Sequence, residues 1–208
     1  RWLAHHGLEG SVVENRPLPP FADEKKPPEN GWTVGYIGRV RDIRSFELLV
    51  EAVKTIPAFE RPKLRVAGDG TAASKVRTLL MSEVEAGTIE AEVSGAFTQS
   101  ELPELLQSVD VMYAMYSPQR GNVLQGALPV KVFDAASGGV PSVVNAGCLM
   151  ADVVVSENIG AHAPWGDAES VGQALRSLRD TVAELAATGE REHQRWLSAM
   201  NPVLEVLQ

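Results

Sequence analysis

The sequence contains very little cysteine: Cys148 stands alone among 208 residues. A single cysteine can form no intrachain disulfide, so a reducing compartment is the simplest setting. No neighbouring histidine or basic group favours its thiolate, and we interpret Cys148 as a small buried apolar residue.

Long apolar runs and an excess of positive charge are also missing. The sequence has no run of about eighteen apolar residues, the length needed to cross a bilayer. Residues 1–6 do not form a secretory signal. The formal net charge of −8 excludes a general positive field for nucleic acid or an anionic membrane. We therefore expect a cytoplasmic protein that binds no nucleic acid, and the lack of an initiator methionine predicts a piece of a longer chain.

Apolar residues make up 44% of the chain and charged residues 22%, which is enough for a substantial globular core. Residues 15–31 differ, because their five prolines and several charges stiffen the stretch and leave little to bury. We predict three parts: an interdomain helix end and Pro-rich linker over 1–30, an α/β domain over 31–190, and a C-terminal helical segment over 191–208.

Beyond residue 31, short apolar runs alternate with stretches of helical period. The predicted strands are Thr33–Ile37, Leu64–Ala67, Ile89–Val93, Val109–Met115, Pro141–Val144 and Ile159–Ala163. Strands that alternate with helices predict right-handed crossovers and a Rossmann-like parallel sheet of about six strands, flanked by helices. Thr71 is placed to cap a helix that runs through Leu80.

One helix-to-strand unit, residues 126–144, combines several features of a ligand site. Pro129 suits the first turn of a helix, where its missing N–H needs no partner. Lys131 and Asp134 are three residues apart and so share a helix face, and the Gly138-Gly139 pair ends the helix. The alternative is an ordinary amphipathic helix joined to a core strand.

Glycines and polar residues follow the ends of the predicted strands. They are Gly38-Arg39, Gly68-Asp69-Gly70, Gly95, Tyr116-Ser117 and Asn145-Ala146. In an open parallel sheet, the carboxyl ends of the strands form the edge where ligands bind. Arg39 and Arg44 could clamp a diphosphate there, although both could equally be solvated surface arginines. Lys131 could add a third cation, and Asp134 could accept hydrogen bonds from a ribose.

These residues resemble a known family. The ordered motifs are Gly38-Arg39 with Arg44, Val66–Gly70, Val93–Phe97, Asp134–Pro141 and Gly166-Asp167. Over roughly residues 31–190 they are similar to the C-terminal, donor-binding domain of family 4 glycosyltransferases, which have the GT-B fold.

The resemblance implies a transferase that takes a sugar from a nucleotide diphosphate sugar, UDP- or GDP-linked, with retention of anomeric configuration. Arg39 and Arg44 would hold the diphosphate and stabilise it as it leaves, and Asp134 would hold the ribose. The other implied donor-binding residues are Gly38, Lys131, Arg120, Asn122 and Gly126, the last three within the loop Tyr116–Gly126 beside the base or the donor sugar. Because the arginines and helix N-termini supply positive charge, neither a metal nor another cofactor is expected.

The resemblance also implies a partner. A missing N-terminal domain would carry the acceptor site, and any peripheral association with a membrane would occur through that domain. The present chain alone should then bind nucleotide weakly and should not turn over. The expected pathway is the assembly of surface polysaccharides or glycoconjugates.

Three positions depart from the family pattern. Arg44 replaces a lysine, Asp134 replaces a glutamate, and Gly126 stands where the first acid of a paired-glutamate motif is expected. The Pro129-x-Lys131-x-x-Asp134 form resembles a subgroup that keeps only the second acid. Gly126 also leaves a second hypothesis open, namely a non-catalytic nucleotide-binding domain that has kept the fold.

Two weaker signals point to other ligands. Gly68-x-Gly70-x-x-Ala73 follows a strand, and Glu90 lies about twenty residues later, a spacing that satisfies the dinucleotide fingerprint and would predict NAD binding. A tight turn capped by Thr71 explains the same glycines. His5-His6 is interpreted as a solvated helix end and not as a metal site, because no partner cluster accompanies it.

Overall fold

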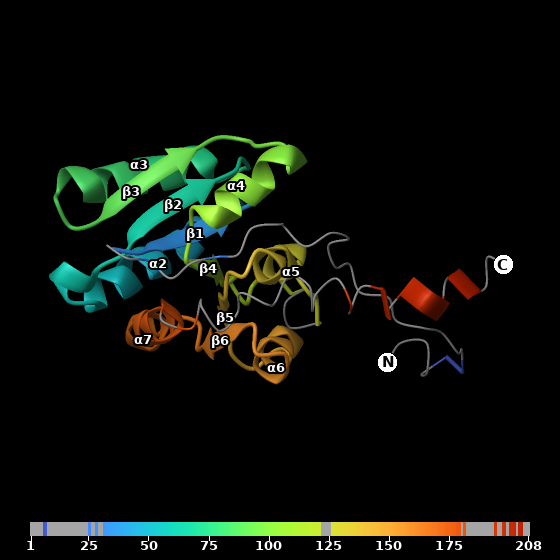
Figure 1. Cartoon of the computed structure of the whole chain (residues 1–208). Helices are drawn as coiled ribbons and strands as arrows, with labels where there is room; N and C mark the ends of the chain where they lie inside the picture. The colour runs from blue at the N-terminus through green and yellow to red at the C-terminus, as the bar shows by residue number, and fades with distance from the viewer. Residues whose placement is uncertain are drawn as a thin grey trace.

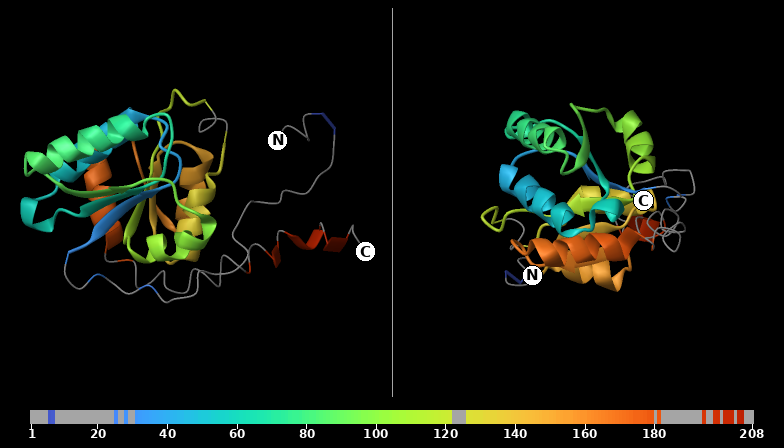
Figure 2. Two further views of the ribbon diagram at one scale, coloured as in Figure 1. Left: turned by 90° about the horizontal axis from the view of Figure 1, so that it is seen from above. Right: turned by 90° about the vertical axis from the view of Figure 1, so that its left-hand side faces the viewer.

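The computed structural model of the chain describes residues 31–121 and 126–179, together with positions 6, 7, 25, 28, 181, 194, 197, 198, 200–202, 204 and 205. The predicted linker over 1–30 and the predicted terminal segment over 191–208 therefore fall largely outside the described residues. Within them, the chain forms an α/β domain in which helices cover both faces of a central sheet (Figures 1 and 2).

The sheet has six strands, all parallel, in the order β3-β2-β1-β4-β5-β6. The strands are β1 (Thr33–Ile37), β2 (Lys63–Ala67), β3 (Glu90–Ser94), β4 (Val111–Ala114), β5 (Ser142–Asn145) and β6 (Gly160–Ala163). The predicted parallel sheet is confirmed. The chain adds β2 and β3 on one side of β1 and then crosses to add the last three strands on the other. β1 and β4 therefore flank the point where the strand order reverses, which is where open α/β sheets bind ligands.

Over residues 31–179 the described chain has six α-helices and two short 3₁₀ turns, and all but the last helix lie between strands. They are α2 (Ile43–Thr55), η1 (Ala58–Glu60), α3 (Ala73–Glu85), η2 (Gln99–Glu101), α4 (Leu102–Gln107), α5 (Val130–Ser137), α6 (Leu149–Ser156) and α7 (Ala168–Arg179). Helices α2, α3 and α7 share one apolar cluster with one face of the sheet, and α4, α5 and α6 pack on the other face (Figure 2).

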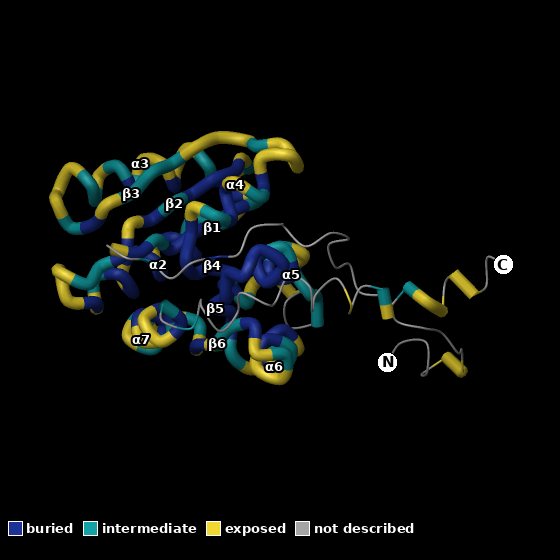
Figure 3. Tube along the Cα trace, viewed as in Figure 1, coloured by how far each residue is buried: buried dark blue, intermediate teal, exposed yellow. Residues whose placement is uncertain are grey.

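Strand β4 shows why the central strands are apolar throughout. Val111 and Tyr113 point into the α2 side of the core, whereas Met112 and Ala114 point into the α4 and α6 side. All four are buried, as expected when helices cover both faces of a parallel sheet. Figure 3 shows the same contrast between the buried centre and the more exposed edge strand β3.

The start of α3 corrects one prediction. The helix begins at Ala73, its N-cap is Ala72, and no side chain caps it, so Thr71 is not the cap. Backbone contacts hold this turn instead, because Ala72 N–H donates to the carbonyl of Val40 at 3.1 Å. The helix also continues past Leu80 to Glu85.

Helix α6 was not among the predicted elements. Its sequence, Leu-Met-Ala-Asp-Val-Val-Val-Ser, is apolar at nearly every position. A helical period cannot be recognised when apolar residues occupy both faces of a short segment. Cys148 is the N-cap of this helix, and it is half-buried with its thiol donating to the carbonyl of Asn145; it is therefore less buried than expected.

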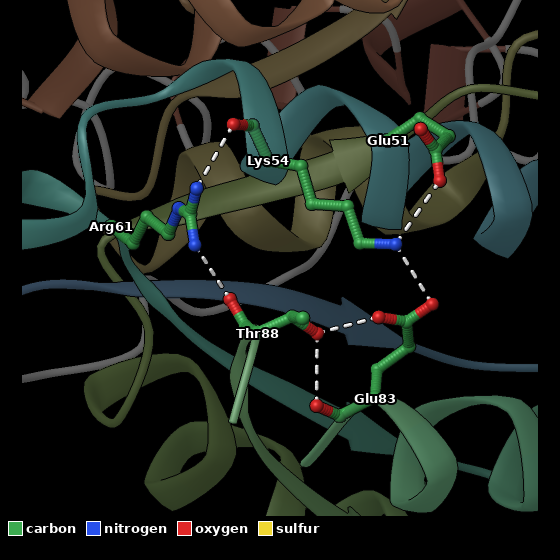
Figure 4. Close-up of polar contacts among 5 residues, drawn as sticks. All are labelled: Glu51, Lys54, Arg61, Glu83 and Thr88. Carbon is green, nitrogen blue, oxygen red and sulfur yellow. Dashed lines mark hydrogen bonds and ion pairs between the residues drawn. The ribbon is translucent and has the colours of Figure 1, made fainter. Parts of the chain in front are cut away.

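Arg61 joins the ends of three elements at the amino edge of the sheet (Figure 4). Its guanidinium donates to the carbonyls of Ile56 at 3.0 Å, Lys54 at 3.1 Å and Thr88 at 2.9 Å. The first two bonds satisfy carbonyls at the end of α2, where the helix itself supplies no N–H partner for the last carbonyls. Lys54 also bonds Glu83 of α3 at 2.8 Å, and this contact lowers the pKa of the Glu83 carboxyl.

Lys25 fastens the linker to the same edge. Its ammonium is buried, donates to the carbonyl of Gln107 and lies 3.5 Å from Asp110. Burial lowers the pKa of Lys25, while Asp110 opposes that shift. Asp110 in turn accepts from the N–H of Thr33 at 2.8 Å. The start of the domain is thus held on the side opposite to the carboxyl ends of the strands.

Candidate functional site

The carboxyl end of β1 and the α4-facing side of β4 border a cavity of about 140 Å³. It is lined by Ile37, Gly38, Phe97, Gln99, Leu102, Leu106, Met112, Lys131 and Asp134. One side of the cavity is apolar and comes from α4 and the segment before it. Lys131 and Asp134 supply the only charged side chains among these lining residues.

Helix α5 brings the two charges together, as the sequence predicted. Lys131 and Asp134 are three residues apart and line the same cavity. Pro129 is the N-cap of the helix and so stands one position earlier than predicted. The glycine pair does end the helix: Gly138 is the C-cap, and Gly139 has a φ of 71°, in the left-handed region.

The ammonium of Lys131 is buried without a hydrogen-bond acceptor among the described residues. It lies 3.5 Å from the ring centroid of Tyr36 and 5.5 Å from that of Tyr116. Burial, together with the nearby charge of Arg120, lowers the pKa of Lys131 to about 7. The faces of the two rings offset part of this cost, because an aromatic face attracts a cation.

Asp134 experiences the opposite shift from the same cause. Burial raises the pKa of its carboxyl to about 6, and no cation offsets that rise. Lys131 and Asp134 therefore share a cavity without neutralising one another. A group with hydroxyls for the acid and negative charge for the ammonium would satisfy both.

A loop follows β4, and two of its side chains contact each other. Arg120 lies 5.1 Å over the ring of Tyr116. The amide of Asn145, at the end of β5, fixes the start of this loop by accepting from the N–H of Tyr116 at 2.8 Å and donating to its carbonyl at 2.9 Å. The sequence marked Asn145 as a strand-end residue but did not reveal this bracing role.

Arg39 and Arg44 lie on the neighbouring β1–α2 segment. Arg39 pairs with Asp69 at 3.1 Å, and both side chains are more than half exposed. Arg44 donates to Gln119 at 3.0 Å. Neither arginine lines the cavity. Exposed pairs of this kind are worth about 0–1 kcal/mol, so a ligand phosphate could replace them, and the diphosphate role remains a prediction.

The remaining predicted residues are Gly38, Gly126 and Asn122. Gly38 lines the cavity with a φ of 133°. Gly126 has a φ of 89°, and a Cβ there would lie 3.5 Å from the side chain of Leu149. Asn122 lies outside the described residues.

The site also contains residues that the sequence did not single out. Tyr36 lies beneath Lys131, and Gln99, Leu102 and Met112 line the cavity. Three of these four are apolar or aromatic, and such residues in strands and helices have the same pattern whether they face a core or a ligand. Phe97 closed one of the recognised motifs, which was the available signal for this wall.

The dinucleotide interpretation of Gly68 and Gly70 is wrong in its geometry. A Cβ on Gly68 would lie 1.9 Å from the carbonyl oxygen of Gly38, and one on Gly70 would lie 2.2 Å from that of Val40. The two glycines therefore allow neighbouring loops to touch. Glu90 opens β3, so it lies at the amino edge of the sheet, opposite to the edge where a ribose-binding acid is needed.

No group of three histidine, cysteine or acidic side chains in the described part of the chain could hold a metal ion. No helix there is long and apolar enough to cross a membrane.

Comparison with known families identifies the domain. The family model described as "Glycosyl transferases group 1" matches residues 31–181. The chain belongs to this glycosyltransferase family. A comparison of this chain with curated proteins found no match.

Solved glycosyltransferases share the fold at low identity. The catalytic domain of cholesterol-α-glucosyltransferase from Helicobacter pylori is 16% identical with a TM-score of 0.58, over 83% of this chain and 99% of that one. Anabaena HepE, solved with UDP-glucose, is 17% identical with a TM-score of 0.63, over 86% and 49%. Sucrose-phosphate synthase from Thermosynechococcus elongatus is 19% identical with a TM-score of 0.65, over 86% and 45%.

The chain therefore spans less than half the length of the latter two proteins. Its fold is that of one Rossmann-like half of a GT-B glycosyltransferase.

Proposed function

We propose that this domain is the donor-binding half of a retaining glycosyltransferase, which takes its sugar from a UDP-linked donor. The observation that carries the proposal is the buried ammonium of Lys131, which lacks a hydrogen-bond acceptor and shares a cavity with Asp134. An ammonium in that state costs several kcal/mol unless a negative charge pairs with it. A ligand phosphate supplies that charge.

The chemistry of the cavity fits the parts of a nucleotide sugar. Phe97, Leu102 and Leu106 offer an apolar wall for the base, and the Asp134 carboxylate accepts from the two ribose hydroxyls. The diphosphate then extends past Lys131 toward Arg39 and Arg44. The choice of uridine is supported by Anabaena HepE, which was solved with UDP and with UDP-glucose.

The catalytic contribution of this half is electrostatic. Transfer of the sugar leaves negative charge on the departing diphosphate, and fixed cations that stabilise this charge lower the barrier. Lys131, Arg39 and Arg44 are the groups that we assign to this role. The acceptor would bind to a second, N-terminal domain, so the present chain should bind the donor without turning it over. Assembly of surface polysaccharides or glycoconjugates in the cytoplasm is the setting that we propose.

Gly126 favours a second candidate, a nucleotide-binding domain without transferase activity. Its φ of 89° leaves no room for an acid without backbone strain, although family relatives are expected to place one there.

Calorimetric titration tests the proposal. The chain is titrated with UDP, GDP, ADP and NAD, and Lys131→Met and Arg39→Ala are compared with Glu51→Gln, an exposed control far from the cavity. We expect UDP to bind most tightly, and both Lys131→Met and Arg39→Ala to weaken its binding. Failure of every nucleotide to bind would overturn the proposal. Binding of UDP together with no release of sugar from UDP-sugars by the longer protein would favour the second candidate.

A further inference from the structure

Tyr36 is a buried ionisable residue that the proposed donor contacts do not use. It lies near the end of β1, and its side chain is almost completely enclosed, with a residue exposure of 3%. Its ring packs on Phe46 of α2, with a centroid distance of 4.6 Å. The ring therefore cannot move freely toward or away from the cavity.

Both ends of this side chain contact the proposed donor site. The hydroxyl donates to the carbonyl of Arg39 at 2.7 Å, and the ring face lies 3.5 Å from the ammonium of Lys131. Gly38 borders this contact: its φ of 133° favours glycine, and a Cβ there would lie 3.4 Å from the end of the lysine side chain, an ordinary van der Waals distance. One rigid residue thus connects the segment that carries Arg39 with the cation from α5.

The aromatic face has a chemical advantage over a carboxylate at this position. A carboxylate would stabilise the ammonium but would also occupy its N–H donors. A ring face stabilises positive charge through its quadrupole and accepts no conventional hydrogen bond. The ring therefore favours the charged form of Lys131 and leaves its N–H donors free for phosphate oxygens.

We propose that Tyr36 is a positioning residue of the donor site, whose ring favours the charged form of Lys131 and leaves its N–H donors unpaired while its hydroxyl anchors the backbone of Arg39. The expected effect of Tyr36 on donor binding rests on the proposed function. Its effect on Lys131 itself does not depend on any ligand.

Other charged and titratable groups also face this pair. They are Arg41 and Asp42 from the β1–α2 segment, Tyr113 from β4, Arg120 and Tyr116 from the loop after β4, and Asp134 from α5. A test must therefore change Tyr36 without altering these groups.

Two substitutions separate the two contacts. Tyr36→Phe keeps the ring and removes the hydroxyl, whereas Tyr36→Leu removes both. Tyr113→Phe is the matched control, because Tyr113 on the adjacent strand also donates to a backbone carbonyl, that of Ser45 at 2.9 Å, away from the cavity. Thermal melts identify a variant that fails to fold, and Tyr36→Met then replaces Tyr36→Leu.

The readouts are the affinity for UDP-glucose between pH 6 and 9 and the pKa of Lys131, measured by NMR on the free chain. We expect Tyr36→Phe to weaken binding about fivefold, the value of one neutral hydrogen bond, with an unchanged pH midpoint. Tyr36→Leu should weaken binding on the order of tenfold or more and move both the midpoint and the pKa of Lys131 to lower pH. Tyr113→Phe should match the unmodified chain.

A Tyr36→Leu chain with the original pKa of Lys131, or one whose pH profile equals that of Tyr36→Phe, would overturn the inference. If the unmodified chain does not bind UDP-glucose, the proposed function fails. The pKa of Lys131 in the three variants then still decides whether the Tyr36 ring favours the charged form of Lys131.

Discussion

Donor binding should be confined to a narrow range of pH. In the free chain, burial places the pKa of Asp134 at about 6 and that of Lys131 at about 7. The carboxylate is the dominant form of Asp134 only above its raised pKa, and the ammonium is the dominant form of Lys131 only below its lowered pKa. Both charged forms therefore coexist best between these two values, and affinity should fall on either side.

The two limbs should differ in steepness. At pH 8 only about one Lys131 in ten keeps its charge, so binding that requires the ammonium weakens by about tenfold, or about 1.4 kcal/mol, per further pH unit. On the acid side, a protonated Asp134 still makes neutral hydrogen bonds to hydroxyls. The loss there is the difference between charged and neutral hydrogen bonds, about 1 kcal/mol or fivefold in affinity.

The assay is calorimetric titration of the chain with UDP-glucose from pH 5 to 9 at constant ionic strength. This ligand is preferred to UDP because it lacks the terminal phosphate whose second ionisation falls at about pH 6. Lys131→Arg keeps its charge throughout the range and should abolish the alkaline limb. Asp134→Asn should abolish the acid limb and bind more weakly. The reasoning would be refuted if the affinity of the unmodified chain were the same across this range. It would also be refuted if the alkaline limb survived in Lys131→Arg.

Three further predictions concern the supports of the site and of the fold. Arg61→Ala removes three hydrogen bonds to carbonyls and should lower the free energy of unfolding by about 2 kcal/mol without changing UDP affinity, as measured by urea denaturation and calorimetry. Gly68→Ala places a Cβ 1.9 Å from the carbonyl oxygen of Gly38 and should cost about 3 kcal/mol; a melting temperature equal to that of the unmodified chain would contradict this. Asn145→Ala frees the backbone of Tyr116 and should weaken UDP binding more than Asn145→Asp, which keeps one acceptor.

Several parts of the fold were predictable because local chemistry decides them. The strand β4 is a continuous apolar run, which is typical of a strand that is covered on both faces, and α5 is bounded by a proline and a glycine pair. The helix α6 was missed because its residues are apolar on all sides. The Thr71 cap was wrong because a carbonyl from a different loop, that of Val40, holds the turn. Such a contact has no local signature.

The candidate site was likewise predictable in part. The spacing of Lys131 and Asp134 requires a shared helix face, and their shared cavity confirms it. Tyr36 gave no signal, since an aromatic residue near a strand end is also ordinary core. The exposed ion pair of Arg39 with Asp69 was equally unpredictable, because long side chains on loops choose among neighbours that the sequence does not order in space.

The sequence by itself determined the succession of strands and helices and the gathering of charged and glycine residues at the strand ends, because periodicity and turn chemistry act over a few residues. Only the tertiary structure decided which of those residues meet. The ammonium of Lys131 lies over the ring of Tyr36. The two residues meet because β1 and β4 are neighbours in the sheet, and the helix that carries Lys131 follows β4. Burial in that contact, and not the residue types alone, brings the pKa values of Lys131 and Asp134 close to neutrality.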